Sequence, residues 1–149
     1  MSVLGALDAI AVKAKTMTGI KEVWTATGSA VSTTLRPIPS RLDDGPVGVV
    51  WIGAGDMVGG NAEGLVFNPT LDIWVQARDA GVAYKTLAAY PDIAMTTFRA
   101  DLDLGGQVTR CIVRGWDELE TETVNNAAWL ILPIRLEVLI LRLAHDATA

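Results

Sequence analysis

The sequence predicts an α+β fold in which a mostly antiparallel β-sheet carries an N-terminal helix and one further helical region. Three observations predict it. Apolar residues alternate with period two over Leu65 to Ala77 and over Ala127 to Leu143, as in strands. They recur every three or four residues over Val3 to Met17 and over Val82 to Leu104, as in helices. Strands are not regularly separated by helices, so a parallel sheet of β-α-β units is not expected.

The N-terminal helix is expected from Val3 to about Met17. Ser2 is a favourable N-cap residue, and Gly19 is a favourable position for the helix to stop. The apolar residues of one face are Val3, Leu7, Ile10, Ala14 and Met17. We expect this face to pack on the sheet.

Two strands separated by irregular chain are expected next. Ile20 to Thr25 can form the first strand, and the small, polar residues 26–34 predict a loop. Arg36 to Pro39 is expected to be extended, because a residue before a proline is disfavoured in the helical region. Val47 to Ala54 is rich in β-branched residues, which predicts the second strand.

The alternation from Leu65 to Ala77 predicts one long, half-buried antiparallel strand. Pro69 has no N–H group, which predicts an edge position or a bulge at that residue. The apolar face is formed by Leu65, Phe67, Leu71, Ile73 and Val75, and the other face includes Asp72, Trp74 and Gln76. Because Trp74 lies on the polar face, it either contacts a partner or is covered by a loop of its own chain.

The helical region from Val82 to Leu104 is expected to break at Pro91, because proline is well tolerated in the first turn of a second helix. Two strands are then expected to close the chain, over Gln107 to Trp116 and over Ala127 to Leu143. In the last strand the even-numbered residues 130–140 are apolar and must be core. The odd-numbered face carries Arg135 and Glu137, which can meet water or a partner.

An acidic, polar connection is expected between these two strands, from Asp117 to Asn126. Its carboxylates include Glu118, Glu120 and Glu122. Their spacing does not fit an EF-hand, so a solvated loop is favoured over a cation site.

The composition argues against several classes of function. Half of the 149 residues are hydrophobic and 19% are charged, yet no apolar run reaches the roughly 18 residues that a membrane helix needs. The net charge of −5 and the lack of a basic run argue against a protein that reads nucleic acid through phosphate contacts. The single Cys111 and the single His145 form no catalytic or metal-binding group, so no catalytic residue, metal or cofactor is predicted.

Length and termini give further expectations. The whole chain, residues 1–149, is expected to form one domain, with residues 144–149 as a frayed tail. The first residues lack the basic start and long apolar core of a signal peptide, so synthesis in the cytoplasm is expected.

A glycine-rich segment from Gly53 to Gly64 follows the second expected strand. It is close to the dinucleotide-binding fingerprint, and Asp72 lies about twenty residues further on, where that fingerprint has an acid. The motif needs a helix directly after the glycines, whereas more glycines and a strand follow here. A flexible hairpin between two antiparallel strands is therefore favoured. The alternative is a small nucleotide-binding enzyme that uses Gly53 to Gly59.

The order of elements resembles the tail terminator family of long-tailed bacteriophages over nearly the whole chain. The resemblance is one of layout: an amphipathic N-terminal helix, a proline-flanked strand, a long alternating strand, a helical region with a Tyr-Pro break and two closing strands. The matching segments are Val3 to Met17, Pro46 to Ala54, Leu65 to Asp79, Tyr90-Pro91, Gln107 to Trp116 and Ala127 to Leu143. Related tail tube and head–tail connector subunits share much of this layout.

The resemblance implies a structural virion protein without enzymatic activity. Such a protein forms a ring, expected to be a homohexamer, that caps the tail tube beneath the head. Its partners would be further copies of itself, the tail tube protein and a connector or stopper protein, with DNA only passing through the lumen. The candidate interface residues are Gly53, Gly55, Asp56, Met57, Gly59, Gly60, Asn61, Asp72, Trp74, Gln76, Glu118, Glu120, Glu122, Arg135 and Glu137.

Overall fold

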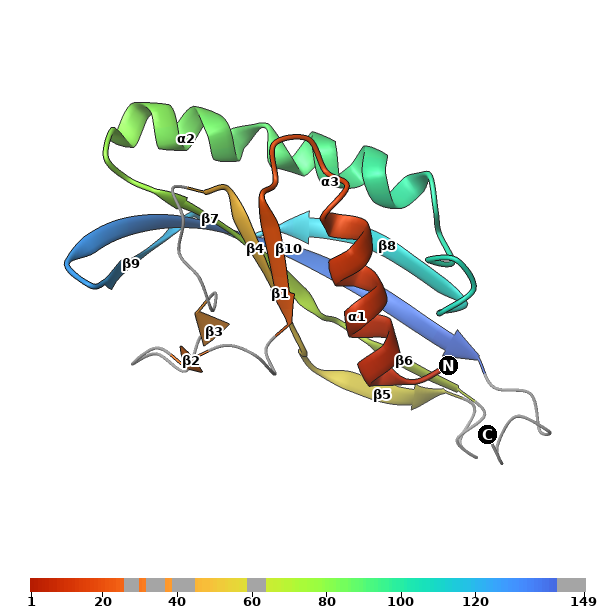
Figure 1. Cartoon of the computed structure of the whole chain (residues 1–149). Helices are drawn as coiled ribbons and strands as arrows, with labels where there is room; N and C mark the ends of the chain where they lie inside the picture. Colours follow the sequence, from red (N-terminus) through yellow and green to blue (C-terminus); the bar gives the residue numbers. More distant parts are fainter. Residues whose placement is uncertain (26–29, 32–36, 39–44, 59–63, 142–149) are drawn as a thin grey trace.

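The computed structural model describes residues 1–25, 30–31, 37–38, 45–58 and 64–141 (Figure 1). Within these residues an eight-stranded, mostly antiparallel sheet carries three helices, which confirms the predicted α+β fold. The strands of this sheet are β1 (Glu22–Thr25), β4 (Val47–Trp51), β5 (Gly55–Val58), β6 (Gly64–Phe67), β7 (Thr70–Gln76), β8 (Arg110–Trp116), β9 (Glu120–Val124) and β10 (Ala127–Leu141). The short strands β2 (Ala30–Val31) and β3 (Pro37–Ile38) form a separate antiparallel pair.

The central strand of the sheet is β10, which is long enough to pair with four others. Along one edge it pairs antiparallel with β7 and then β6, and along the other edge with β9 and then β8. Beyond β7 lies β4, and β1 pairs with β4 in parallel. At the other end β5 pairs with β6.

The single strand expected from Leu65 to Ala77 is in fact two strands, β6 and β7. The break falls at Asn68 and Pro69, because Pro69 has no N–H to give to a ladder. Its carbonyl oxygen instead accepts a hydrogen bond of 3.0 Å from the backbone N–H of Leu136. The irregularity predicted at Pro69 is confirmed, but β7 lies inside the sheet, between β4 and β10.

Three helices, α1 (Val3–Ala14), α2 (Ala80–Ala88) and α3 (Tyr90–Arg99), pack on one face of the sheet (Figure 1). The predicted N-cap is confirmed, since Ser2 Oγ accepts a hydrogen bond from the Gly5 N–H. Asp79 caps α2 in the same way, and Pro91 lies in the first turn of α3, where the break was expected. The helical region therefore begins slightly earlier than predicted.

The main core lies between the helices and the sheet. The even-numbered side chains of β10 point into it, and Leu132, Ile134, Leu136, Val138 and Ile140 are buried as expected. They meet Leu71 and Ile73 from β7 and Phe98 from α3. Tyr90 is also buried there, and its hydroxyl donates a hydrogen bond of 2.9 Å to the carbonyl oxygen of Thr18.

The opposite face of the sheet has a second, smaller core, which the sequence analysis did not predict. Its buried members are Val47, Val49, Trp74, Trp129 and Ile131. The rings of Trp74 and Trp129 lie 6.3 Å apart at 57°. Trp24 and Ile38 pack against this cluster, so β1 and β3 help to cover the face. At this end, the sheet is buried on both sides.

Two other expectations about the strands need correction. Residues 120–124 of the expected acidic connection form β9, which pairs with β10. Asn125 and Asn126 have φ angles of +52° and +63°, the left-handed conformation of a two-residue hairpin turn, in which asparagine is favoured. Ala30–Val31, in the expected loop 26–34, is a strand, whereas most of that loop lies outside the described residues.

Candidate functional site

The glycine-rich candidate segment begins as an edge strand rather than a loop. β5 pairs with β6, with Met57 opposite Leu65, and both Asp56 and Met57 are exposed. The segment does lead into an antiparallel pair of strands, but residues 55–58 are themselves the first of these strands and not part of a flexible loop. Gly59, Gly60 and Asn61 lie outside the described residues.

The glycines at the start of this segment allow two strands to approach closely. A Cβ atom on Gly53 would overlap the backbone oxygen of Asn68, and one on Gly55 would lie 2.7 Å from Cβ of Phe67. A strand follows Gly55, so residues 53–58 do not provide the helix N-terminus that binds a pyrophosphate. The nucleotide-binding alternative therefore loses its structural basis over the described part of the motif.

Two of the three candidates on β7 are inside the protein. Asp72 and Trp74 are both fully buried, whereas Gln76 is half-buried. The expectation that their face is exposed is wrong, because β7 is flanked by β4 and β10 and its second face is covered by the smaller core. Trp74 is thus covered by its own chain, one of the two outcomes that the sequence left open.

The charged candidates of the last strand form ion pairs with β8 and its following turn. Glu137 accepts hydrogen bonds of 2.9 to 3.0 Å from Arg114, and Arg110 approaches it at 3.8 Å. Arg135 is paired with Asp117 at 3.1 Å. The prediction that Arg135 and Glu137 meet water or a partner agrees with their exposure, which is 53% and 19% for the side chains. The structure therefore brings these two candidates together with three residues that the sequence analysis had not connected to them.

The acidic candidates lie on both sides of the start of β9. Glu118 and Glu120 are exposed, and Glu122 is half-buried. Glu120 and Glu122 belong to β9, opposite Ile131 and Trp129 of β10. Glu118 precedes β9 and lines a groove, so the three carboxylates do not share one site.

This groove, which we call the Trp116 groove, was missed in the sequence. It has a volume of about 550 Å³ and lies between the α2–α3 junction and the segment that joins β8 to β9. Its lining includes Tyr84, Pro91, Asp92, Trp116, Glu118 and Leu119. Trp116 is 52% exposed and Tyr84 is 59% exposed. An exposed tryptophan directly before two acidic residues was the only sequence signal, because the helical half of the groove is distant in the chain.

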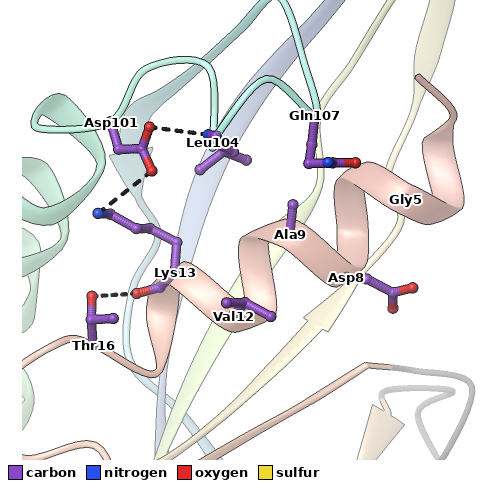
Figure 2. Close-up of a pocket in the computed structure, with 10 residues that line it drawn as sticks. Gly5, Asp8, Ala9, Val12, Lys13, Thr16, Asp101, Leu104 and Gln107 are labelled. Atoms are coloured by element: carbon purple, nitrogen blue, oxygen red, sulfur yellow. Dashed lines mark hydrogen bonds and ion pairs between the residues drawn. The ribbon is translucent and has the colours of Figure 1, made fainter.

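A second groove, of about 530 Å³, lies between α1 and the turn at residues 101–107. Figure 2 shows Ala9 and Lys13 pointing toward that turn, whereas Asp8 points away from it. Asp8 and Val12 lie on the α1 side of the groove lining. Lys13 forms an ion pair of 3.7 Å with Asp101, which also accepts a hydrogen bond from the Gly105 N–H. The ion pair holds α1 against the turn, and the hydrogen bond stabilises the turn itself.

Groups with catalytic or metal-binding potential are sparse in the described part of the chain. Burial raises the pKa of the Cys111 thiol to about 12, so this thiol is protonated at neutral pH. Among the described residues, no three His, Cys, Asp or Glu side chains are grouped in a way that could hold a metal ion. The described helices include none long and apolar enough to cross a membrane.

No protein-family model matches this sequence, and no curated protein matches it.

Proposed function

We propose that this chain is a ring-forming structural subunit of a bacteriophage tail, of the tail-terminator type. In this role it caps the tail tube, joins it to the head–tail connector and lets DNA pass through the ring. The proposal starts from the resemblance in element order, and the α+β fold with its N-terminal helix and Tyr90-Pro91 break is compatible with that layout.

The observation that carries the proposal is where large apolar side chains remain exposed. Leu4 and Val12 project from α1, Ile52 and Met57 lie at or beside the β5 edge, and Tyr84 and Trp116 line one groove. Single exposed apolar residues are normal, whereas apolar side chains that gather on one surface mark sites of contact with other molecules. A ring subunit needs at least two such surfaces, because each copy contacts one neighbour on either side.

The charges on the open part of the sheet are also compatible with a channel for DNA. The arginines of β8 and β10 are paired with carboxylates, as described above. Paired arginines attract phosphate less than free ones do, and the net charge of −5 repels it. DNA could then move past this surface without being held.

Sedimentation velocity, with and without purified tail tubes, tests the proposal. We expect either a discrete ring, with six copies as the expected size, or a monomer that co-sediments with tubes at a few copies per tube. A monomer that never sediments with tubes would contradict the proposal.

A further inference from the structure

The Trp116 groove is lined by apolar and acidic side chains. Tyr84, Pro91 and Trp116 supply apolar surface, whereas Asp92 and Glu118 supply carboxylates. Asp117 is already paired with Arg135. Within the described chain, Asp92 and Glu118 have no cationic partner, and no Lys or Arg lines the groove. The groove is therefore complementary to an apolar segment that carries a basic residue.

The outer face of α1 has this chemistry. Leu4, Asp8, Val12 and Lys15 follow one another at helical spacing, and all four are exposed. Val12 is 72% exposed, more than any other large apolar side chain in the described residues, and Leu4 is 57% exposed. Val12 lies across the helix from the buried residues Ile10 and Ala14, and it also lines the groove between α1 and the turn at residues 101–107. Lys13 forms an ion pair with Asp101, whereas Lys15, at the end of the helix, is exposed.

We propose that the outer face of α1 in one copy docks in the Trp116 groove of the next copy. This inference rests on the proposed function and deepens it by naming the two surfaces that meet. Val12 and Leu4 would contact Tyr84 and Trp116, and Lys15 would lie near Asp92 and Glu118.

A second copy is the occupant to which the inference commits, because Lys15 on the outer face of α1 is opposite in charge to Asp92 and Glu118 in the groove. Copies with a net charge of −5 repel one another at a distance, so a stable contact needs local complementarity such as Lys15 against Glu118. The helix face and the groove are different surfaces, which gives a head-to-tail contact that closes into a ring when the rotation between copies permits. Asp8 is the one charge of the helix face that opposes docking.

Two variants, one damaged in the helix face and one in the groove, test whether these two surfaces bind each other. Val12→Glu damages the helix face and leaves the groove, whereas Tyr84→Ala with Trp116→Ala damages the groove and leaves the helix face. Each variant alone should be monomeric. Mixed in equal amounts, they should form a heterodimer and stop there, because one intact groove and one intact helix remain. Leu102→Glu, at another exposed apolar residue, is the matched control and should assemble like the unchanged chain.

A charge reversal gives a second readout, which also works if copies associate only on tube ends. Lys15→Glu alone and Glu118→Lys alone should each weaken ring formation or tube capping by about tenfold. Both changes in one chain should restore it, since each contact again pairs opposite charges. Asp8→Lys should strengthen assembly.

The outcomes separate this inference from the proposed function. Rings or capped tubes that are unaffected by these variants overturn the inference and leave the proposed function standing. Mixtures that remain monomeric under conditions in which the unchanged chain forms rings do the same. If the groove variant lost tube binding while Val12→Glu kept it, the groove would bind a tube protein rather than a second copy. That result would also overturn the inference. An unchanged chain that forms no ring and ignores tubes contradicts the proposed function first.

Discussion

The two faces of the sheet are built in different ways. The helix-covered face is uniform, since α1, α2 and α3 bury a continuous row of aliphatic side chains along β10 and β7. The other face changes along its length. Near Trp74 and Trp129 it forms a second core, and toward Arg114 and Glu137 it is an open surface of ion pairs.

This difference shows that alternation along a strand predicts one buried face better than it predicts the state of the other. A polar residue such as Asp72 in an alternating pattern predicts a face of the strand that is open to water. Here Asp72 is fully buried, because both faces of β7 are covered. Whether the second face of a strand is buried depends on the position of the strand within the sheet and on the segments that pack over it. The ion-paired open surface described above lies at the β8 end of β10.

The largest effect is expected when Trp74 is replaced by alanine. If the second face is a true core, the substitution lowers the free energy of unfolding by about 3–5 kcal/mol. Ile134→Ala on the helix-covered face should cost a similar amount, about 2–5 kcal/mol. Urea unfolding measures both. An unchanged midpoint for Trp74→Ala would mean that the second face is not a core.

The close approach of β5 to its neighbours can be broken at Gly53. Gly53→Ala places a methyl group against the backbone of Asn68, which cannot move away cheaply. We expect a loss of about 1–3 kcal/mol in thermal or urea unfolding, typical of overpacking. Gly81→Ala is the control, because its Cβ would make only an ordinary 3.4 Å contact with Asp79. Equal effects at both glycines would contradict the packing described for β5.

The helix-covered face should also be sensitive to alkali through Cys111. Burial raises the pKa of its thiol from 9.0 to about 12, so the folded chain keeps a proton that the unfolded chain loses. The contribution of this thiol to the free energy of unfolding is constant below pH 9. Between pH 9 and 12 it falls by about 1.4 kcal/mol per pH unit.

Cys111→Ala isolates this effect from that of Tyr90, whose pKa is also raised by burial. The variant starts less stable because a buried group is lost, but its stability should fall less steeply from pH 9 to 10. Urea unfolding at pH 8, 9 and 10 measures the two slopes. Parallel curves for the two proteins would show that the thiol is not buried as described.

The smallest effect is expected on the open part of the second face. Arg114→Gln removes the closest partner of Glu137, but Arg114 is 53% exposed and Arg110 remains nearby. The expected loss is about 0–1 kcal/mol and should shrink in high salt. A loss comparable to that of Trp74→Ala would mean that this end is a core too.

The sequence predicted the elements with regular periods and missed what depends on distant chain. The helix from Val3, the break at Pro91 and the buried face of β10 follow from local spacing and proline chemistry. The split of β6 from β7 was visible only as the irregularity at Pro69. The strand β9 was missed because its polar residues resemble a loop and the turn signal in Asn125-Asn126 was not used.

The candidate site was predicted only in part. Arg135 and Glu137 were placed on an accessible face, but their partners come from another strand, whose register no local pattern gives. Asp72 was placed on an accessible face, whereas for Trp74 cover by its own chain had been left open. The cover of this face comes from Trp24 of β1 and Ile38 of β3, which no local pattern near β7 predicts. The Trp116 groove combines residues of α2, α3 and the β8–β9 connection, so it exists only once the chain is folded.

Electron microscopy of purified tail tubes mixed with this chain tests the central proposal most directly. We expect an additional ring of density at one end of each tube, with the subunits arranged head to tail around the lumen. Tube ends that remain bare when the chain is present in large excess would contradict the assignment as a tail-terminator subunit.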